Sequence, residues 1–195
     1  MRVFVALDIP EEVRAALGKL IARLRPACHA ARWVRIEGVH LTLKFIGELQ
    51  PEKIEPIKAS LARIRCPDTI ELKFRNVGFF PDERRPRVFW AGIETGPELG
   101  ALAEAVETSL EPLGIAKELR AFSPHLTLAR LEPRRGANAG SGFAVDALSK
   151  AISEAGSLEF GAGIANEFHL YQSILKSGGA EYTRLATFRF TGDES

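Results

Sequence analysis

Two histidines and two threonines stand in the same short pattern at two places in this chain. The tetrapeptide His-Leu-Thr-Leu occupies residues 40–43 and again residues 125–128, which places the copies 85 residues apart. Residues i and i+2 of a β-strand point to the same face, so each copy would present an imidazole beside a hydroxyl, with leucines on the opposite face. Histidine is the side chain that exchanges protons near neutral pH. The pattern therefore predicts two polar strand faces suited to proton transfer.

A matched pair of histidines suits a reaction that needs a general base and a general acid together. We predict that His40 and His125 are catalytic, one taking a proton from the nucleophile and the other giving one to the leaving oxygen. The hydroxyls of Thr42 and Thr127 would donate hydrogen bonds to the anionic oxygens of the atom under attack. A phosphodiester fits this arrangement. No cluster of Asp and Glu near the motifs offers a Mg²⁺ site, so the predicted chemistry uses no metal and no other cofactor.

Other interpretations of the motif are weaker. A single His-x-Thr pair on a strand is more often packed or solvent-facing than catalytic, and it is the repetition that favours catalysis. A zinc site would need further ligands beside the two motif histidines, and these four candidates show no recognisable zinc spacing: His29, His169, Cys28 and Cys66. We interpret His29 and His169 as non-catalytic.

Composition and charge are those of a soluble globular protein. The chain has 195 residues, 46% of them hydrophobic and 26% charged, and its formal net charge of +1 gives no overall signal for nucleic acid. Basic residues gather at 84–87 and 130–135, where either a solvated loop or a phosphate-binding patch is possible. Two cysteines without metal spacing, no targeting segment and no apolar run of about 20 residues predict a cytoplasmic protein. Nucleotide-triphosphate fingerprints are absent.

Hydrophobic periodicity predicts the order strand, helix, strand, helix, strand in each half. Strands are expected over 2–9, 39–46, 69–80, 87–94, 125–131, 164–175 and 182–190. Helices are expected over 10–25, 51–66, 97–113 and 144–155, with a glycine-rich loop at 136–142. The triplet Arg-Val-Phe at 2–4 recurs at 87–89 with the same offset as the histidine motif, which favours duplication.

The predicted fold class follows from this order. We expect an α+β protein of two similar lobes, with mainly antiparallel sheets, helices on the outside and an active-site cleft between the lobes. Residues 1–195 would form a single bilobal domain made of duplicated units at about 1–86 and 87–190.

The chain also resembles a known family, the 2H phosphoesterases, which carry two His-x-Thr/Ser motifs. More closely it resembles the RNA 2′,3′-cyclic phosphodiesterases, also called 2′-5′ RNA ligases. The resemblance covers essentially the whole chain. It rests on the segments 2–8, 40–47, 80–81, 85–92, 124–130 and 170–173, followed by Tyr182.

This resemblance implies an activity and a set of roles. The enzyme would open RNA 2′,3′-cyclic phosphate ends to 2′-phosphomonoesters without metal or ATP, and in reverse would join a 5′-hydroxyl in a 2′-5′ linkage. His40 would give a proton to the departing 3′-oxygen, and His125 would activate water. Thr42 and Thr127 would hold the phosphate oxygens. The implied partners are RNA ends, with no membrane, and the expected state is a monomer.

Five further side chains are open in this interpretation. Strict alternation turns Arg130 away from His125, so Arg130 reaches a phosphate only through a bulge or a strand end and otherwise pairs with an acid. Lys44 shares the face of His40 and would contact RNA or solvent, while Phe45 is expected in the core. Phe80 and Trp90 are candidates to stack on a terminal base, with core packing favoured for Trp90.

Two rival functions remain. One is a related enzyme acting on a small cyclic nucleotide or on an ADP-ribose cyclic phosphate. The other is a non-catalytic RNA-binding module, although binding alone would not need a matched acid and base.

Overall fold

Two antiparallel sheets form the framework of the molecule. The computed structural model describes residues 1–29, 31–66, 69–131, 140–176 and 179–190. We call the first sheet the His40 sheet; its strands, in spatial order, are β3 (Leu41–Glu48), β1 (Arg2–Leu7), β8 (Glu167–Lys176) and β9 (Gly179–Arg189). We call the second the His125 sheet; its strands are β2 (Ala31–Trp33), β6 (His125–Leu131), β5 (Val88–Thr95), β4 (Ile70–Phe80) and β7 (Glu159–Ala165).

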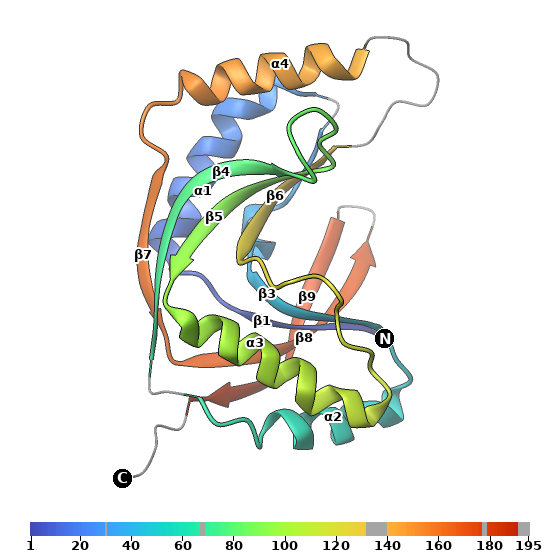
Figure 1. Cartoon of the computed structure of the whole chain (residues 1–195). Helices are drawn as coiled ribbons and strands as arrows, with labels where there is room; N and C mark the ends of the chain where they lie inside the picture. Colours follow the sequence, from blue (N-terminus) through green and yellow to red (C-terminus); the bar gives the residue numbers. More distant parts are fainter. Residues whose placement is uncertain (30, 67–68, 132–139, 177–178, 191–195) are drawn as a thin grey trace.

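The described part of the chain has four α-helices, which lie on the outside of the two sheets (Figure 1). They are α1 (Glu11–Leu24), α2 (Ile54–Leu61), α3 (Pro97–Leu110) and α4 (Gly140–Ser153). Short 3₁₀ turns lie at η1 (Arg25–Ala27), η2 (Ile36–Gly38), η3 (Pro51–Lys53) and η4 (Glu111–Leu113). Helix α1 packs against β7 and α4, whereas α3 packs against β3 and α2. The predicted α+β class, with antiparallel sheets and outer helices, is confirmed.

The lobes do not coincide with the two halves of the chain. Each sheet takes strands from both halves, since β8 and β9 complete the His40 sheet while β2 and β4 complete the His125 sheet. The helices cross over as well. Helix α1 leaves β1 of the His40 sheet and covers the His125 sheet, and α3 leaves β5 and covers the His40 sheet. The units predicted at 1–86 and 87–190 are therefore interleaved in space, and the duplication itself stays a prediction.

Several predicted boundaries are wrong. The strand expected over 164–175 is two strands, β7 and β8, which are separated at Asn166. Most of β7, Glu-Phe-Gly-Ala-Gly-Ile-Ala, lies before that range; it carries two glycines and little alternation, so it gave no strand signal. The segment before His40 contains the short strand β2, and the helix expected over 51–66 is only η3 and α2. Most of the predicted loop at 136–142 lies outside the described residues.

The leucines of the repeated motif anchor their strands in the core, as predicted. Leu41, Leu126 and Leu128 are fully buried and Leu43 nearly so. Burial of one such side chain stabilises the fold by roughly 2 kcal/mol. The apolar face of each motif thus fixes the backbone that carries its histidine and threonine.

Candidate active site

The two motif histidines are held in the same way. Nδ1 of His40 lies 2.6 Å from the carbonyl oxygen of Gly38, and Nδ1 of His125 lies 2.8 Å from that of Ser123. In each case the acceptor is two residues earlier in the chain. A carbonyl oxygen can only accept, so Nδ1 must carry the hydrogen in both rings. Nε2 is then the nitrogen left to take up or release a proton toward a substrate.

A β-bulge follows each threonine. In β3, Thr42 lies opposite Ala6 of β1, but the next pair is Lys44 with Val5, so Leu43 is an extra residue. The same step occurs in β6, where Thr127 lies opposite Trp90 of β5 and Ala129 lies opposite Phe89. A bulge adds one residue to one strand and reverses the alternation beyond it. In both strands, the side chains after the bulge therefore point to the opposite face from the one that strict alternation would give them.

The positions predicted for Lys44 and Phe45 are wrong, because the first bulge reverses the side-chain alternation after Leu43. Lys44 is only 6% exposed, and its ammonium contacts the carboxylate of Glu107 at 2.5 Å and the carbonyl oxygen of Ala116 at 2.6 Å. It therefore belongs to the packing of α3 on the His40 sheet. Phe45 is 61% exposed and its ring contacts that of Phe4, on the face that carries His40.

The second bulge brings Arg130 to the face of His125. Leu128 and Ala129 are both buried, and Arg130 is exposed. Strict alternation would have turned Arg130 away from His125, and the bulge is the feature that restores it. Arg130 and Phe45 thus occupy equivalent positions, five residues after their histidines.

Aromatic rings surround His40. Its imidazole stacks on Phe4 at a centroid distance of 4.5 Å, and Tyr182 meets it edge-on at 5.0 Å. Tyr171 stacks on the Phe4 ring at 5.5 Å. Burial raises the pKa of Tyr171 to about 12, helped by the hydrogen bond that its hydroxyl donates to Asp8 at 2.6 Å. These rings hold His40 in a largely apolar setting.

That setting controls the protonation of His40. Burial lowers its pKa from 6.5 to about 4, and the nearby Arg14 cation acts in the same direction. The Gly38 carbonyl and the Asp8 carboxylate oppose this change because they favour the protonated ring. Burial is the larger effect, so His40 is neutral at pH 7 in the free protein.

His125 has a different aromatic neighbour. Phe80 meets its ring edge-on at 4.9 Å, and Trp90 lies against Phe80 at 5.2 Å. Trp90 lies flat over Gly78, where an added Cβ would come within 2.3 Å of the indole. The core position favoured for Trp90 from sequence is wrong, because Trp90 lies opposite Thr127 on the polar face of the sheet.

The shared Arg-Val-Phe triplet is one residue out of register with the histidine motif. Because Thr42 lies opposite Ala6 and Thr127 opposite Trp90, the residue equivalent to Trp90 is Ala6. Phe4 consequently faces His40, whereas Phe89 is fully buried in the core. The triplet therefore gives no structural support for duplication, which stays a prediction.

The two histidine strands approach each other where the sheets meet. Strands β3 and β6 lie side by side in this region (Figure 1). Arg130 of the His125 sheet is close enough to Tyr182 of the His40 sheet to lower the pKa of its hydroxyl, against the upward effect of burial. Tyr182 in turn contacts His40. Arg130 therefore lies beside the surroundings of both histidines.

The other two histidines lie outside the repeated motifs, although His169 contacts Asp8 and Tyr171. His169 is buried, with Nδ1 at 3.0 Å from the Thr187 hydroxyl and Nε2 at 3.6 Å from a carboxylate oxygen of Asp8. Burial lowers the pKa of His169. His29 is exposed. Within the described ranges, no group of three or more His, Cys, Asp or Glu side chains could hold a metal ion, so the zinc alternative gains no support there.

Sequence reasoning gave no role to the residues around His40. Phe4, Asp8, Tyr171 and Tyr182 come from both ends of the chain, and only the pairing of β1 with β8 and of β8 with β9 brings them together. The basic cluster at 84–87 forms an exposed turn in which Asp82 accepts from two backbone N–H groups, and the end of the cluster at 130–135 lies outside the described residues. No helix in the described part of the chain is long and apolar enough to cross a membrane.

Comparison with known proteins places this arrangement among phosphoesterases. The family model described as LigT-like phosphoesterase matches residues 7–90. An RNA 2′,3′-cyclic phosphodiesterase of Thermotoga maritima is 31% identical over 193 residues, which cover 98% of this chain and 97% of that protein. One from Archaeoglobus fulgidus is 32% identical, covering 96% and 99%. The crystal structure of E. coli LigT complexed with 3′-AMP is 28% identical and superposes with a TM-score of 0.76, covering 97% and 98%.

Proposed function

Because the chain belongs to the LigT-like phosphoesterase family, we propose that it hydrolyses RNA 2′,3′-cyclic phosphate ends to 2′-phosphomonoesters without metal or ATP. The observation that carries this proposal is the matched pair of histidines. Each has Nδ1 bonded to the carbonyl two residues earlier, which leaves Nε2 for the substrate. Two proton-transfer groups on approaching strands are what an in-line displacement at phosphorus requires.

In the proposed reaction, Nε2 of His125 takes a proton from water as the water oxygen attacks phosphorus. The bond between phosphorus and the 3′-oxygen breaks, and Nε2 of His40 gives its proton to that oxygen. The products are a 2′-phosphomonoester and a 3′-hydroxyl. One proton is taken and one is given, so the total charge of the pair is unchanged, and each ring returns to its starting protonation state by exchanging protons with water.

The non-bridging oxygens need donors, since negative charge grows on them in the transition state. Thr42 and Thr127 are partly exposed and share the faces of His40 and His125. Their hydroxyls can therefore donate hydrogen bonds to the non-bridging phosphate oxygens. Arg130 adds a guanidinium, whose paired N–H groups suit a phosphate. A lost donor of this kind typically costs about 10²- to 10³-fold in kcat.

As an acid, His40 must be protonated when the substrate is bound. Its pKa of about 4 means that protonation near neutral pH costs about 3 kcal/mol relative to a free histidine. A phosphate anion about 4 Å away would offset about 4 kcal/mol in a medium with a dielectric constant of about 20. The anionic substrate therefore raises the pKa of His40, so that the ring takes up from water the proton that it later donates, and His40 stays neutral until the substrate binds.

Exposed side chains beside the histidines favour RNA over a small cyclic nucleotide. Phe45 offers an open aromatic ring on the His40 face, and Arg130 offers a planar guanidinium on the His125 face. Unpaired RNA bases stack on both kinds of group. Joining of a 5′-hydroxyl in place of water would give a 2′-5′ linkage through the same groups. We expect a monomer that acts on RNA ends in the cytoplasm.

The test offers oligoribonucleotides ending in a 2′,3′-cyclic phosphate, in EDTA, to the wild type and to His40→Ala and His125→Ala. We expect 2′-phosphate ends from the wild type and losses of at least ~10²-fold from either substitution. His29→Ala is the matched control, because that histidine is exposed and lies on neither strand, and it should keep full activity. Loss of wild-type activity in EDTA would instead indicate a metal enzyme. Turnover of free cyclic mononucleotides with RNA ends ignored would favour the small-molecule alternative.

A further inference from the structure

One arginine outside the motifs holds the turn that orients His40. Arg14 lies on α1, and its Nη1 donates to three carbonyl oxygens: that of Ile36 at 2.8 Å, that of Glu37 at 3.1 Å and that of Val39 at 3.2 Å. The last two belong to the residues directly before and after Gly38. The carbonyl of Gly38 is the one that accepts from Nδ1 of His40. Arg14 thus fixes the peptide units on both sides of the group that sets the tautomer and direction of the imidazole.

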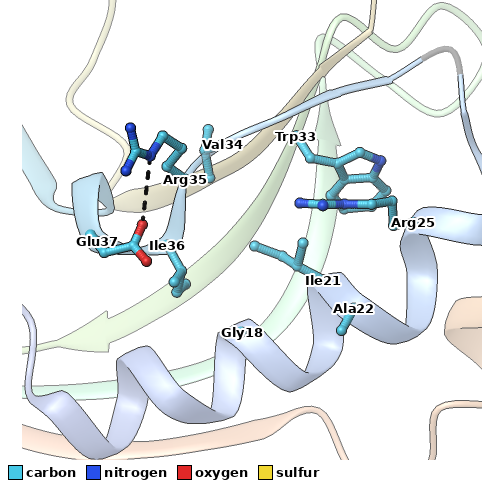
Figure 2. A pocket seen from close by; sticks show the side chains of 9 residues that line it. All are labelled: Gly18, Ile21, Ala22, Arg25, Trp33, Val34, Arg35, Ile36 and Glu37. Atoms are coloured by element: carbon cyan, nitrogen blue, oxygen red, sulfur yellow. Dashed lines mark ion pairs between the residues drawn. The ribbon is translucent and has the colours of Figure 1, made fainter. Parts of the chain in front are cut away.

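The helix that carries Arg14 belongs to the other lobe. Helix α1 packs against β7 of the His125 sheet and against α4, whereas the turn leads into β3 of the His40 sheet. Figure 2 shows residues 33–37 lying along α1, with Ile36 beside Gly18 across a shallow hollow that contains neither histidine. Gly18 is one helical turn after Arg14, on the same face of α1. An added Cβ there would lie 3.6 Å from Ile36, so helix and turn are in close contact.

The opposite side of the turn is blocked by Tyr182. A Cβ on Gly38 would come within 2.7 Å of the Tyr182 ring, which itself meets the His40 ring edge-on. Gly38 is therefore confined between a guanidinium from one lobe and an aromatic ring from the other. The turn before His125 differs from the turn before His40. Among the hydrogen bonds of the described residues, no arginine side chain donates to the backbone carbonyls around Ser123.

We propose that Arg14 is a positioning residue for His40: it ties the 36–39 turn to the lobe that carries His125 and thereby sets how the two imidazoles face one substrate. This proposal rests on the proposed function, in which His40 gives up a proton. The proposal also distinguishes the two histidines, whose motifs are identical, because only His40 would depend on an arginine from the other lobe. A reacting group displaced by about 1 Å can lose about 10²-fold in rate, so a distant anchor of this kind has a measurable effect.

The experiment compares Arg14→Gln and Arg14→Lys with Arg23→Gln. Arg23 is the matched control, since it also lies on α1 and also donates to backbone carbonyls, in this case those of Glu154 and Ala155 after α4. We expect Arg14→Gln to lower kcat on a cyclic phosphate end by about 10- to 100-fold with little change in KM. Arg14→Lys should be intermediate, because its ammonium keeps the charge but is one bond shorter. Arg23→Gln should stay within about two-fold of the wild type.

A second readout separates positioning from simple loss of stability. The charged groups that act on His40 are Asp8 and Arg14, and the cation lowers its pKa. In Arg14→Gln, the NMR titration of the His40 ring should therefore move to higher pH. Equal loss of kcat in Arg14→Gln and Arg23→Gln, or an unmoved His40 titration, would overturn the proposal. If the wild type opens no cyclic phosphate, the proposed function fails, and the His40 titration still decides whether Arg14 governs this turn.

Discussion

The low pKa of His40 makes the stability of the protein depend on pH in a way that one substitution can isolate. The pKa is about 4 in the folded protein and 6.5 in an exposed chain. Below pH 6.5 the unfolded chain gains a proton that the folded protein does not accept until the pH approaches 4. Unfolding therefore becomes easier as the pH falls from 6.5 to 4 and changes little further below that. The linkage amounts to about 2 kcal/mol at pH 5 and about 3 kcal/mol in full.

His40→Gln removes this linkage and keeps an amide that can donate to the Gly38 carbonyl. We would measure the free energy of unfolding in urea at pH 7.5 and at pH 5 for both proteins. Every other titrating group is shared, including buried His169, so its contribution cancels in the comparison. The wild type should lose about 2 kcal/mol more than His40→Gln between the two pH values. Equal losses in the two proteins would refute the claim that burial holds His40 neutral.

Substitutions at three further positions test the Thr42 hydroxyl, the exposed Phe45 ring and the buried Lys44 ion pair. Thr42→Val should lower kcat by about 10²-fold with wild-type folding, and Thr42→Ser should recover most of it; equal activity in the two variants would remove the hydroxyl from the mechanism. Phe45→Ala should lower kcat/KM about 5- to 100-fold on an oligonucleotide and less than about two-fold on a cyclic mononucleotide, because only the longer substrate offers a second base to stack. Lys44→Met should destabilise the protein by about 3 kcal/mol in urea unfolding, since it removes the cation that balances the Glu107 carboxylate, and a double substitution with Glu107→Leu should recover stability.

Sequence reasoning worked as far as strand alternation holds. It placed His40 with Thr42 and His125 with Thr127, and it sent the four leucines to the core. It failed immediately beyond the motif. Lys44, Phe45 and Arg130 were all assigned to the wrong face or left open, because each lies after a bulge. Neither bulge contains a glycine or another residue that marks it, so one extra residue in a regular strand has no local signal.

The pairing of strands that are far apart in the chain was the other feature that could not be predicted from the sequence. Hydrophobic periodicity predicted the order of most elements, but the interleaving of the lobes depends on β8 and β9 returning to the His40 sheet. That return brings Tyr171 and Tyr182 to a histidine more than 130 residues earlier in the chain. Tyr171 then reaches Asp8, at the end of β1. No periodicity within one segment could predict these contacts, because they depend on which strand edges meet.

The difference between the two histidines comes from these long-range contacts. Within the motif they are alike, since each has the same leucines, the same threonine two residues later, the same bond from Nδ1 and the same bulge. A symmetric pair cannot by itself decide which ring gives the proton. The surroundings break the symmetry: His40 lies among Phe4, Tyr171 and Tyr182, with Asp8 and Arg14 acting on its charge. In the proposed reaction, a ring that is neutral without substrate and charged only beside an anion would donate its proton only when a phosphate is present. The role of acid that we propose for His40 is thus consistent with its low pKa, because the substrate supplies the negative charge.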